Sequence, residues 1–441
     1  ALNNMDAEAK ESFYKTVFMN DDSEYAAKLR VEYYRTKFRS MAENVTIGKG
    51  VNIQKGQPLI INASIYAIDM ARACVKEAYA AGAKQVVVFY NDEKISREHY
   101  LNQDVETLCN VRPWQVDCRL DYFKEGAAIL HIISELPNIY AGVEASKVNQ
   151  ANLAFSKVSG ELKAYTLKSK VQWCIVAVPN QEWAEKVFPN EENAMEKLWT
   201  AILDCAHVRE DNDPIQEWND MIDHFDSRLS IMNEHNFKAL RFKNRIGTDL
   251  EVGLVENHVW AGGCEVAGNG VPFEPNILTE EIFCMPSKYQ VNGKVVSSKP
   301  LNYNGGVIDN FTITFKDGKA IDFDAECGKE YLEQLITFDE GSPYLGEVAL
   351  VPYHSPISES GILFYNTLFD QNASCHLALG AAYPMNVKGG HDMSKEELAA
   401  AGANDSMTHV HFMFGTDDMS IVGIKADGSE VNVFVNGDFV F

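Results

Sequence analysis

The stretch that decides the fold is residues 58–90, PLIINASIYAIDMARACVKEAYAAGAKQVVVFY. A short apolar run opens it, a segment of helical composition follows over residues 65–81, and a β-branched run closes it over residues 85–90. Ser64 is placed to cap the start of the helix, and Gly82 is placed to end it. Two apolar strands joined by a helix usually pair in parallel through a right-handed crossover. The stretch therefore predicts the first unit of an open α/β sheet.

The alternation of strand and helix continues beyond this unit. Apolar runs at 129–133 and 172–178 predict two more strands, and residues 181–187 predict a helix after the second. We expect residues 46–233 to form an open α/β domain that ends in the helical segments 192–206 and 215–232, and residues 1–45 to form a helical lead-in. The domain has neither a G-x-G-x-x-G nor a Walker A motif, so its fold alone assigns no nucleotide site.

Beyond residue 234 the pattern changes to short strands and turns. Residues 234–441 are expected to form a mainly antiparallel α+β domain that binds metal. The dipeptides Asn292-Gly293 and Asp317-Gly318 predict hairpin turns, and the tail 426–437 predicts another hairpin. Strands are predicted at 239–242, 250–254, 291–298 and 311–315, and helices at 329–335, 374–383 and 394–401.

Composition and charge limit the classes of partner. The chain has 441 residues, with 39 basic and 63 acidic side chains and a net charge of −24. Such an excess of acid argues against binding to nucleic acid or to an anionic membrane. No apolar run is long enough to span a membrane and the first residues lack a signal-peptide core, so we expect a cytoplasmic protein. Nine scattered cysteines without a C-x-x-C pair predict reduced thiols.

The stretch 368–411 carries the first sign of a metal site. His409 and His411 are two apart in a segment of strand character, so their imidazoles project from one face. His376 and Tyr383 are seven apart, and they share a face if their Ala/Leu-rich run is helical. A site that gathers imidazoles, carboxylates and a phenol usually binds a metal ion.

Each of these residues also has a plainer structural explanation. A lone histidine in an apolar segment is more often a hydrogen-bonded core residue, and the pair Glu280-Glu281 could belong to a solvated loop. Cys375 lies beside His376, but nothing nearby resembles a Cys-His-Asn arrangement, so we expect a packed thiol and not a nucleophile. The metal hypothesis therefore requires that groups far apart in sequence meet at one point.

The second half contains a series of ordered motifs, namely Thr279-Glu280-Glu281-Ile282-Phe283, Leu345-Gly346-Glu347-Val348, Thr367-Leu368-Phe369-Asp370, Gly380-Ala381-Ala382-Tyr383 and His409-Val410. These motifs resemble those of the aminopeptidase T and aminopeptidase S (peptidase S) family of metallo-aminopeptidases, of which this chain would be a divergent member. The resemblance runs from about residue 40 to the C-terminus. It implies a homodimer with enclosed active sites, one or two Zn, Co or Mn ions, and removal of N-terminal residues from short peptides.

The resemblance also implies roles for individual residues. It makes Glu347 the more probable bridging carboxylate between metals, and it leaves open whether Glu280 or Glu281 faces them. Glu280 is retained as a catalytic candidate that could hold the α-ammonium group of the substrate. The residues that match metal ligands or the active-site tyrosine of the family are Glu281, Glu347, His376, His409 and Tyr383.

The sequence departs from the family pattern at three positions. His411 stands where the family has Asp, Gln371 where it has Glu, and Leu278 where it has Pro. The first two changes remove two negative charges, each worth about 4 kcal/mol of attraction to a unit charge at ~4 Å with an effective dielectric constant of about 20. We retain His411 as a ligand candidate and Gln371 as a catalytic candidate, and expect one metal position to be weakened. The alternative function is a diverged homologue that is no peptidase, either a metalloenzyme for another small amide or amine or a binding protein.

Overall fold

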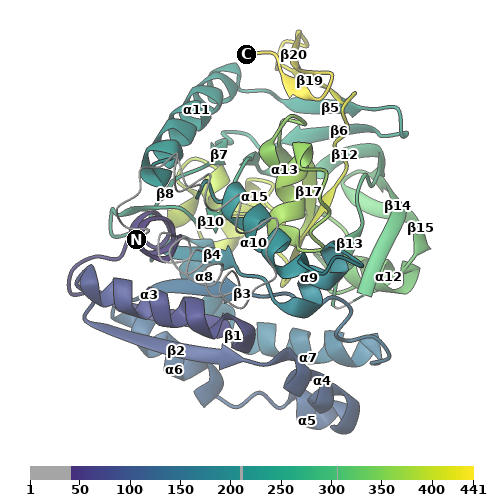
Figure 1. The fold of residues 1–441 in the computed structure, drawn as a ribbon. Coiled ribbons are helices and arrows are strands. Elements are labelled where there is room, and N and C mark those ends of the chain that lie inside the picture. The colour runs from purple at the N-terminus through teal and green to yellow at the C-terminus, as the bar shows by residue number, and fades with distance from the viewer. Residues whose placement is uncertain (1–40, 209–211, 305) are drawn as a thin grey trace.

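The computed structural model describes residues 41–208, 212–304 and 306–441 (Figure 1). It begins with the π-helix η2 (Met41–Gly50), so most of the lead-in predicted over residues 1–45 lies outside the described residues. Purple and blue elements of the first half occupy the lower part of Figure 1, and green and yellow elements of the second half occupy the upper part. Within the described ranges, no helix combines the length and the apolar character needed to cross a membrane.

The unit predicted from residues 58–90 forms as expected. Strands β1 (Pro58–Ser64) and β2 (Gln85–Asn91) pair in parallel and are joined through helix α3 (Ile68–Ala80). The Ser64 side chain accepts a hydrogen bond from the Tyr66 N–H, but the turn that it caps is a separate 3-10 helix, η3 (Ile65–Ala67). Gly82 follows α3 with a φ of +99°, in the left-handed region that favours glycine.

Three further strands complete a parallel sheet with the order β10-β4-β3-β1-β2. Strands β3 (Ala128–Ile133) and β4 (Trp173–Ala177) confirm the predicted ones. Strand β10 (Asn276–Ile277) comes from the second half of the chain and pairs in parallel with β4. The second half thus completes the sheet of the first, and the division predicted at residue 233 stays a prediction.

Helices cover both faces of this sheet, which explains why its strands are apolar throughout. On one face, Leu59 and Ile61 belong to the same buried cluster as Met70 of α3. On the other face, Ile60 packs with Phe123. The remaining helices of the first half are α4 (Glu93–Asn102), α5 (Val105–Cys109), α6 (Trp114–Lys124), α7 (Ala145–Val158), α8 (Gly160–Leu167), α9 (Gln181–Val187), α10 (Ala194–Cys205) and α11 (Pro214–His235).

Antiparallel sheets dominate the second half, as predicted. The larger sheet has the order β13-β14-β12-β6-β5-β19-β20-β21, with β15 paired to β14 through the predicted turn at Asp317-Gly318. Its strands are β5 (Ala239–Lys243), β6 (Asp249–Leu254), β12 (Pro286–Val296), β13 (Leu301–Tyr303), β14 (Gly306–Lys316), β15 (Lys319–Cys327), β19 (Ser420–Ile424), β20 (Glu430–Val435) and β21 (Asp438–Phe439). Strands β8 (Glu265–Val266) and β9 (Pro272–Phe273) form a separate pair.

The smaller antiparallel sheet has the order β18-β17-β16-β11-β7. Its strands are β7 (Ala261–Gly262), β11 (Ile282–Cys284), β16 (Leu345–Leu350), β17 (His376–Gly380) and β18 (His409–Met413). Helices and 3-10 turns connect the strands of this half, namely α12 (Lys329–Ile336), α13 (Pro356–Glu359), α14 (Thr367–Asp370), η4 (Gln371–Ala373), η5 (Pro384–Asn386), η6 (Gly390–Asp392) and α15 (Lys395–Ala400).

Two local predictions in this half are wrong. Residues 374–383 contain strand β17 and not a helix, because every residue of β17 is buried and the strand lies between β16 and β18, pairing with both. Tertiary pairing here overrides the helical propensity of Ala and Leu. Asn292-Gly293 lies inside β12 and not in a turn. Gly293 has a φ of +118°, and a Cβ there would lie 2.2 Å from the Asp249 carbonyl oxygen of β6, so glycine allows the close approach of two strands.

Candidate metal centre

The candidate ligands come together on one face of the smaller antiparallel sheet. Glu347 lies on β16, His376 is the first residue of β17, and His409 and His411 lie on β18. Glu281 directly precedes β11, on the other side of β16. Three neighbouring strands and the residue before a fourth therefore contribute these five side chains, which are spread over about 130 residues of sequence.

The pairing register explains why the side chains meet. Ala378 on β17 pairs with Glu347 on one side and with His411 on the other. Paired residues point to the same face of a sheet, and so do residues two apart on one strand, which adds His376 and His409. Because the Ala378 methyl group is small, the longer side chains on either side can approach each other above it.

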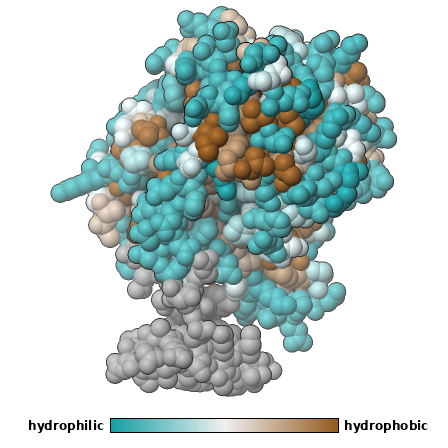
Figure 2. Space-filling model, turned by 90° about the horizontal axis from the view of Figure 1, so that it is seen from above, coloured by the Kyte–Doolittle hydropathy of each residue, from teal (hydrophilic) through white to brown (hydrophobic). Residues whose placement is uncertain are grey.

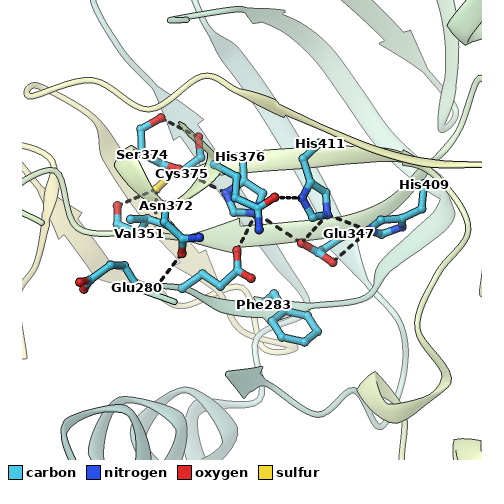
Figure 3. Close-up of polar contacts among 12 residues, drawn as sticks. Glu280, Phe283, Glu347, Val351, Asn372, Ser374, Cys375, His376, His409 and His411 are labelled. Carbon is cyan, nitrogen blue, oxygen red and sulfur yellow. Dashed lines mark hydrogen bonds and ion pairs between the residues drawn. The ribbon is translucent and has the colours of Figure 1, made fainter. Parts of the chain in front are cut away.

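Glu347 lies at the centre of the cluster (Figure 3). Its Oε1 lies 3.4 Å from Nε2 of His376 and 3.5 Å from Nε2 of His411, and its Oε2 lies 3.4 Å from Nε2 of His409. Nε2 of His376 also lies 2.8 Å from Oε2 of Glu281. Two carboxylates and three imidazoles thus converge on one buried point.

The outer nitrogen of each imidazole fixes the orientation of its ring. Nδ1 of His376 lies 3.3 Å from the Ser374 carbonyl oxygen, and Nδ1 of His409 lies 2.6 Å from that of Ala381. Nδ1 of His411 contacts Oε1 of the Gln371 side chain. Since these oxygens can only accept, each Nδ1 carries a hydrogen, and a neutral ring then directs the lone pair of Nε2 into the cluster.

The inner atoms fit a bound cation better than they fit each other. Nε2 of His409 and Nε2 of His411 lie 2.8 Å apart, where two lone pairs would repel. Nε2 of His376, Oε1 of Glu347 and Oε2 of Glu281 are buried and make no hydrogen bond of acceptable geometry. Buried polar atoms without partners are uncommon. Two carboxylates with three neutral imidazoles also provide the charge and the donor atoms that a divalent cation needs.

The pKa values agree with this charge distribution. Burial would raise the pKa of Glu347, but the surrounding imidazoles outweigh burial and hold its pKa well below the usual range. Burial lowers the pKa of His411 to about 3, so this ring is neutral. For His376, burial is outweighed by Glu281 and Glu347, which raise its pKa to about 10. A cation bound at Nε2 of His376 would replace that proton, as metal ions do at their ligands.

The structure separates the neighbours Glu280 and Glu281. Glu281 borders the cavity beside the cluster, whereas the Glu280 carboxylate points away from it (Figure 3). The Glu280 backbone N–H donates to Oδ1 of Asn372 at 2.7 Å, and Arg228 is the charged group that acts on its carboxyl. The role predicted for Glu280 in substrate binding therefore has no geometric support.

Tyr383, Gln371 and Cys375 lie close to the cluster. The ring of Tyr383 lies 4.6 Å from that of His409, and burial raises its pKa well above the usual range, so the phenol keeps its proton. Gln371 is buried, and its side-chain oxygen contacts His411. The Cys375 thiol is buried and contacts the backbone of Val351, and burial raises its pKa to about 12, as expected of a structural thiol.

A narrow cavity of about 50 Å³ adjoins the cluster. The walls include Tyr383, Phe283 and Glu265. Sequence reasoning missed Glu265, which is the one acidic residue among the described wall residues besides Glu281 and Glu347. It lies in a two-residue strand with no recognisable motif around it, so the sequence offers no signal for it.

Comparison with known proteins agrees with this geometry. Residues 35–439 match the family described as thermophilic metalloprotease (M29). Aminopeptidase AmpS of Bacillus subtilis (strain 168) is 42% identical over 413 residues, which cover 93% of this chain and 100% of AmpS. Aminopeptidase 2 of Geobacillus stearothermophilus is 41% identical over 89% of this chain and 95% of its own length. The solved structure of wild-type AmpT from Thermus thermophilus superposes with a TM-score of 0.84 at 34% identity, covering 92% of this chain and 100% of AmpT.

Proposed function

This chain belongs to the thermophilic metalloprotease family (M29), and we propose that it is a metal-dependent aminopeptidase that removes N-terminal residues from short peptides. The observation that carries the proposal is the convergence of two carboxylates and three imidazole Nε2 atoms on one buried point. The aminopeptidases among its relatives support the same reaction.

We propose that the cluster holds one or two divalent cations. Glu281 and His376 provide donors at one end of the cluster and His409 provides one at the other end. Glu347 lies between them, with Oε1 toward His376 and His411 and Oε2 toward His409. Mixed imidazole and carboxylate donors suit Zn or Co, and also Mn, better than Ca. The end with His409 has only the shared Glu347 carboxylate, so it should bind cations more weakly.

When bound, a divalent cation would polarise the scissile carbonyl group and lower the pKa of water to ~7. The protein's own residues then provide the rest of the chemistry. The Tyr383 phenol is protonated, so it can donate a hydrogen bond to the oxyanion that develops on the substrate. Gln371 has no carboxylate and cannot accept a proton. Its contact with His411 supports a positioning role instead.

We propose that Glu265 recognises the free N-terminus of the substrate. It faces the cavity and accepts a hydrogen bond from the Ser169 hydroxyl, and burial raises its pKa to about 7. An α-ammonium group beside it would favour the ionised form, since opposite charges attract strongly in a buried site. Glu265 would then hold the α-ammonium group of the substrate, the role that the sequence suggested for Glu280.

The proposal also covers the cellular compartment and the oligomeric state. We propose a cytoplasmic homodimer, as the family resemblance implies. All nine cysteines are unpaired, as is usual in a reducing compartment. Hydrophobic residues gather near the middle of the face seen in Figure 2, and such a patch is a candidate for subunit contact. Light scattering coupled to size-exclusion chromatography measures the mass and tests the dimer.

A peptidase assay tests the function. Purified protein is incubated with tripeptides and with Zn, Co or Mn, and the released N-terminal residues are quantified. We expect release that a chelator abolishes and that excess metal restores, and no release from N-acetylated peptides. Glu347→Gln should reduce both the metal content and the hydrolysis to background. Absence of hydrolysis with all three metals, from protein shown to contain metal, would contradict the proposal.

A further inference from the structure

A second cavity lies in the first half of the molecule, between the parallel sheet and helices α6, α7 and α8. Its volume is about 600 Å³, far larger than the space beside the metal cluster. Asn62, Phe89 and His131 form part of its floor, and they pair in register across β2, β1 and β3. Each lies in the carboxyl-terminal half of its strand, where open α/β sheets bind ligands.

The charge of this cavity is opposite to that of the chain. The protein has 63 acidic and 39 basic side chains, yet no acidic residue is among the described residues that line the cavity. The lining includes Arg119, His131 and Lys163. In a chain with a net charge of −24, a large cavity lined only by neutral and basic groups points to a negatively charged ligand.

Arg119 is prepared to bind such a ligand. Its guanidinium lies over the Phe89 ring, 4.1 Å from the ring centre. Its Nε donates to Oδ1 of Asn62 at 3.3 Å, and Nη1 donates to the Gln115 carbonyl oxygen at 2.9 Å. Among the described residues no carboxylate pairs with this guanidinium, and Nη2 has no protein acceptor. A stacked guanidinium with a free edge is a good donor to a carboxylate.

The two other basic groups also lack an acidic partner in the described ranges. Burial, assisted by the charge of Arg119, lowers the pKa of His131 to about 4. Lys163 donates to the Ser156 hydroxyl at 2.9 Å and to the Met407 carbonyl oxygen at 3.4 Å, and burial lowers its pKa. His131 is therefore uncharged near pH 7, and the positive groups of the cavity are Arg119 and Lys163, with no carboxylate among the described residues that line it.

Aromatic side chains define the rest of the ligand. Phe89 and Phe123 line the interior, and Trp114 and Phe155 line the cavity with 68% and 40% of their surface exposed. Exposed tryptophan and phenylalanine beside a cavity usually contact an apolar ligand group. We propose that this cavity binds a small organic acid, a carboxylate carried on an aromatic or apolar body, at a site separate from the metal centre.

Isothermal titration calorimetry on the full-length protein tests the proposal with a matched pair of probes. N-acetyl-phenylalanine carries the carboxylate and the aromatic body, and its amide carries the same body without charge. Neither has the free amine of an aminopeptidase substrate. We expect the acid to bind at least about tenfold more tightly than the amide, as is usual for a charge-assisted pair.

Two substitutions in the cavity lining test whether the acid binds there. Arg119→Gln removes the guanidinium, and Gln115→Glu adds a carboxylate to the lining with little change of shape. Each should weaken binding of the acid at least about tenfold and leave binding of the amide unchanged. Arg72→Gln is the control, because Arg72 lies on α3 at the other face of the sheet and pairs with Asp69 at the surface. It should bind the acid like the wild type.

The result that would overturn the proposal is equally specific. Equal affinities for acid and amide, or full binding of the acid by both Arg119→Gln and Gln115→Glu, would show that the cavity is not an anion site. Loss of acid binding in His376→Ala with full binding in Arg119→Gln would place the acid at the metal centre instead. Because Gln115→Glu is nearly isosteric, it keeps the test valid even if Arg119→Gln unfolds.

Discussion

At the scale of single residues, the contact between Gln371 and His411 joins two departures from the family pattern into one. The sequence presents them as separate losses of negative charge, because they are 40 positions apart. In the structure, the Gln371 side-chain oxygen contacts Nδ1 of His411, which leaves Nε2 of His411 for a cation. Together, Gln371 and His411 place an oriented imidazole where the family pattern has two acidic residues.

This contact predicts the effect of Gln371→Met. The variant keeps the size of the buried side chain but removes the acceptor, so the His411 ring is no longer held in one orientation. Loss of such a partner typically lowers metal affinity about 10- to 100-fold. Competition with a chromophoric chelator measures this affinity. Gln371→Glu retains an acceptor and serves as the control. Equal affinities in Gln371→Met and wild type would mean that Gln371 does not position His411.

Glu265 gives a second prediction at this scale. Glu265→Gln removes the negative charge from the cavity wall but can still accept the hydrogen bond from Ser169. We expect KM for tripeptides to rise at least about tenfold, since a buried ammonium loses its charged partner, while kcat falls much less. Steady-state kinetics measure both. Glu280→Gln is the matched control, because its carboxylate points away from the cluster, and it should change KM little. A rise in KM for Glu280→Gln without one for Glu265→Gln would instead assign substrate recognition to Glu280.

At the scale of elements, strand register decides whether the metal centre can form. Ala378 of β17 lies between Glu347 and His411, and Ala378→Leu would fill the space in which they meet. We expect this variant to lose its bound metal and about 1–3 kcal/mol of stability through overpacking. Metal analysis and urea unfolding measure the two effects. Leu377→Met, on the opposite face of β17, should keep the metal. Full metal content in Ala378→Leu would contradict the proposed geometry.

The same strand shows what sequence can and cannot predict. A strand buried on both faces is apolar throughout, and a strand buried on one face alternates apolar and polar residues. These two patterns identify the parallel sheet and most of the antiparallel strands. Residues 374–383 resembled a helix, since the pairing that makes β17 a strand is made with distant residues. His409 and His411 were predicted on one face for the right reason, their spacing on a strand. The carbonyl oxygens of Ser374 and Ala381 could not be predicted, because a main-chain group leaves no trace in the side-chain sequence.

At the scale of the whole molecule, the two halves of the chain meet at polar contacts as well as through β10. Nδ2 of Asn366 donates to Oε1 of Glu135 at 3.2 Å, which joins a residue after β3 to the loop before α14. Burial, with Glu93 and Asp370 nearby, raises the pKa of Glu135 to about 7. A carboxyl with a raised pKa binds its proton more tightly in the folded state, so the stability that it contributes is present below pH ~4.5 and is lost as pH rises toward ~7.

This linkage predicts the behaviour of Glu135→Gln. The amide keeps the acceptor for Asn366 but cannot ionise. The variant should therefore be more stable than wild type at pH 8, and the difference should shrink as the pH falls to 4.5. Urea unfolding at several pH values measures it. Glu185→Gln, which changes an exposed helical carboxylate, should show no such trend. A stability difference for Glu135→Gln that does not vary with pH would contradict the buried carboxyl.

The most direct test of the metal centre is a crystal structure of the purified protein with anomalous diffraction measured at the Zn or Co absorption edge. We expect one or two anomalous peaks beside Glu347, each about 2.0–2.2 Å from carboxylate oxygens and imidazole nitrogens. The nearest nitrogens should be the Nε2 atoms of His376, His409 and His411. Crystals grown with metal that show no peak within the reach of Glu347, or a peak elsewhere in the molecule, would contradict the proposed metal centre.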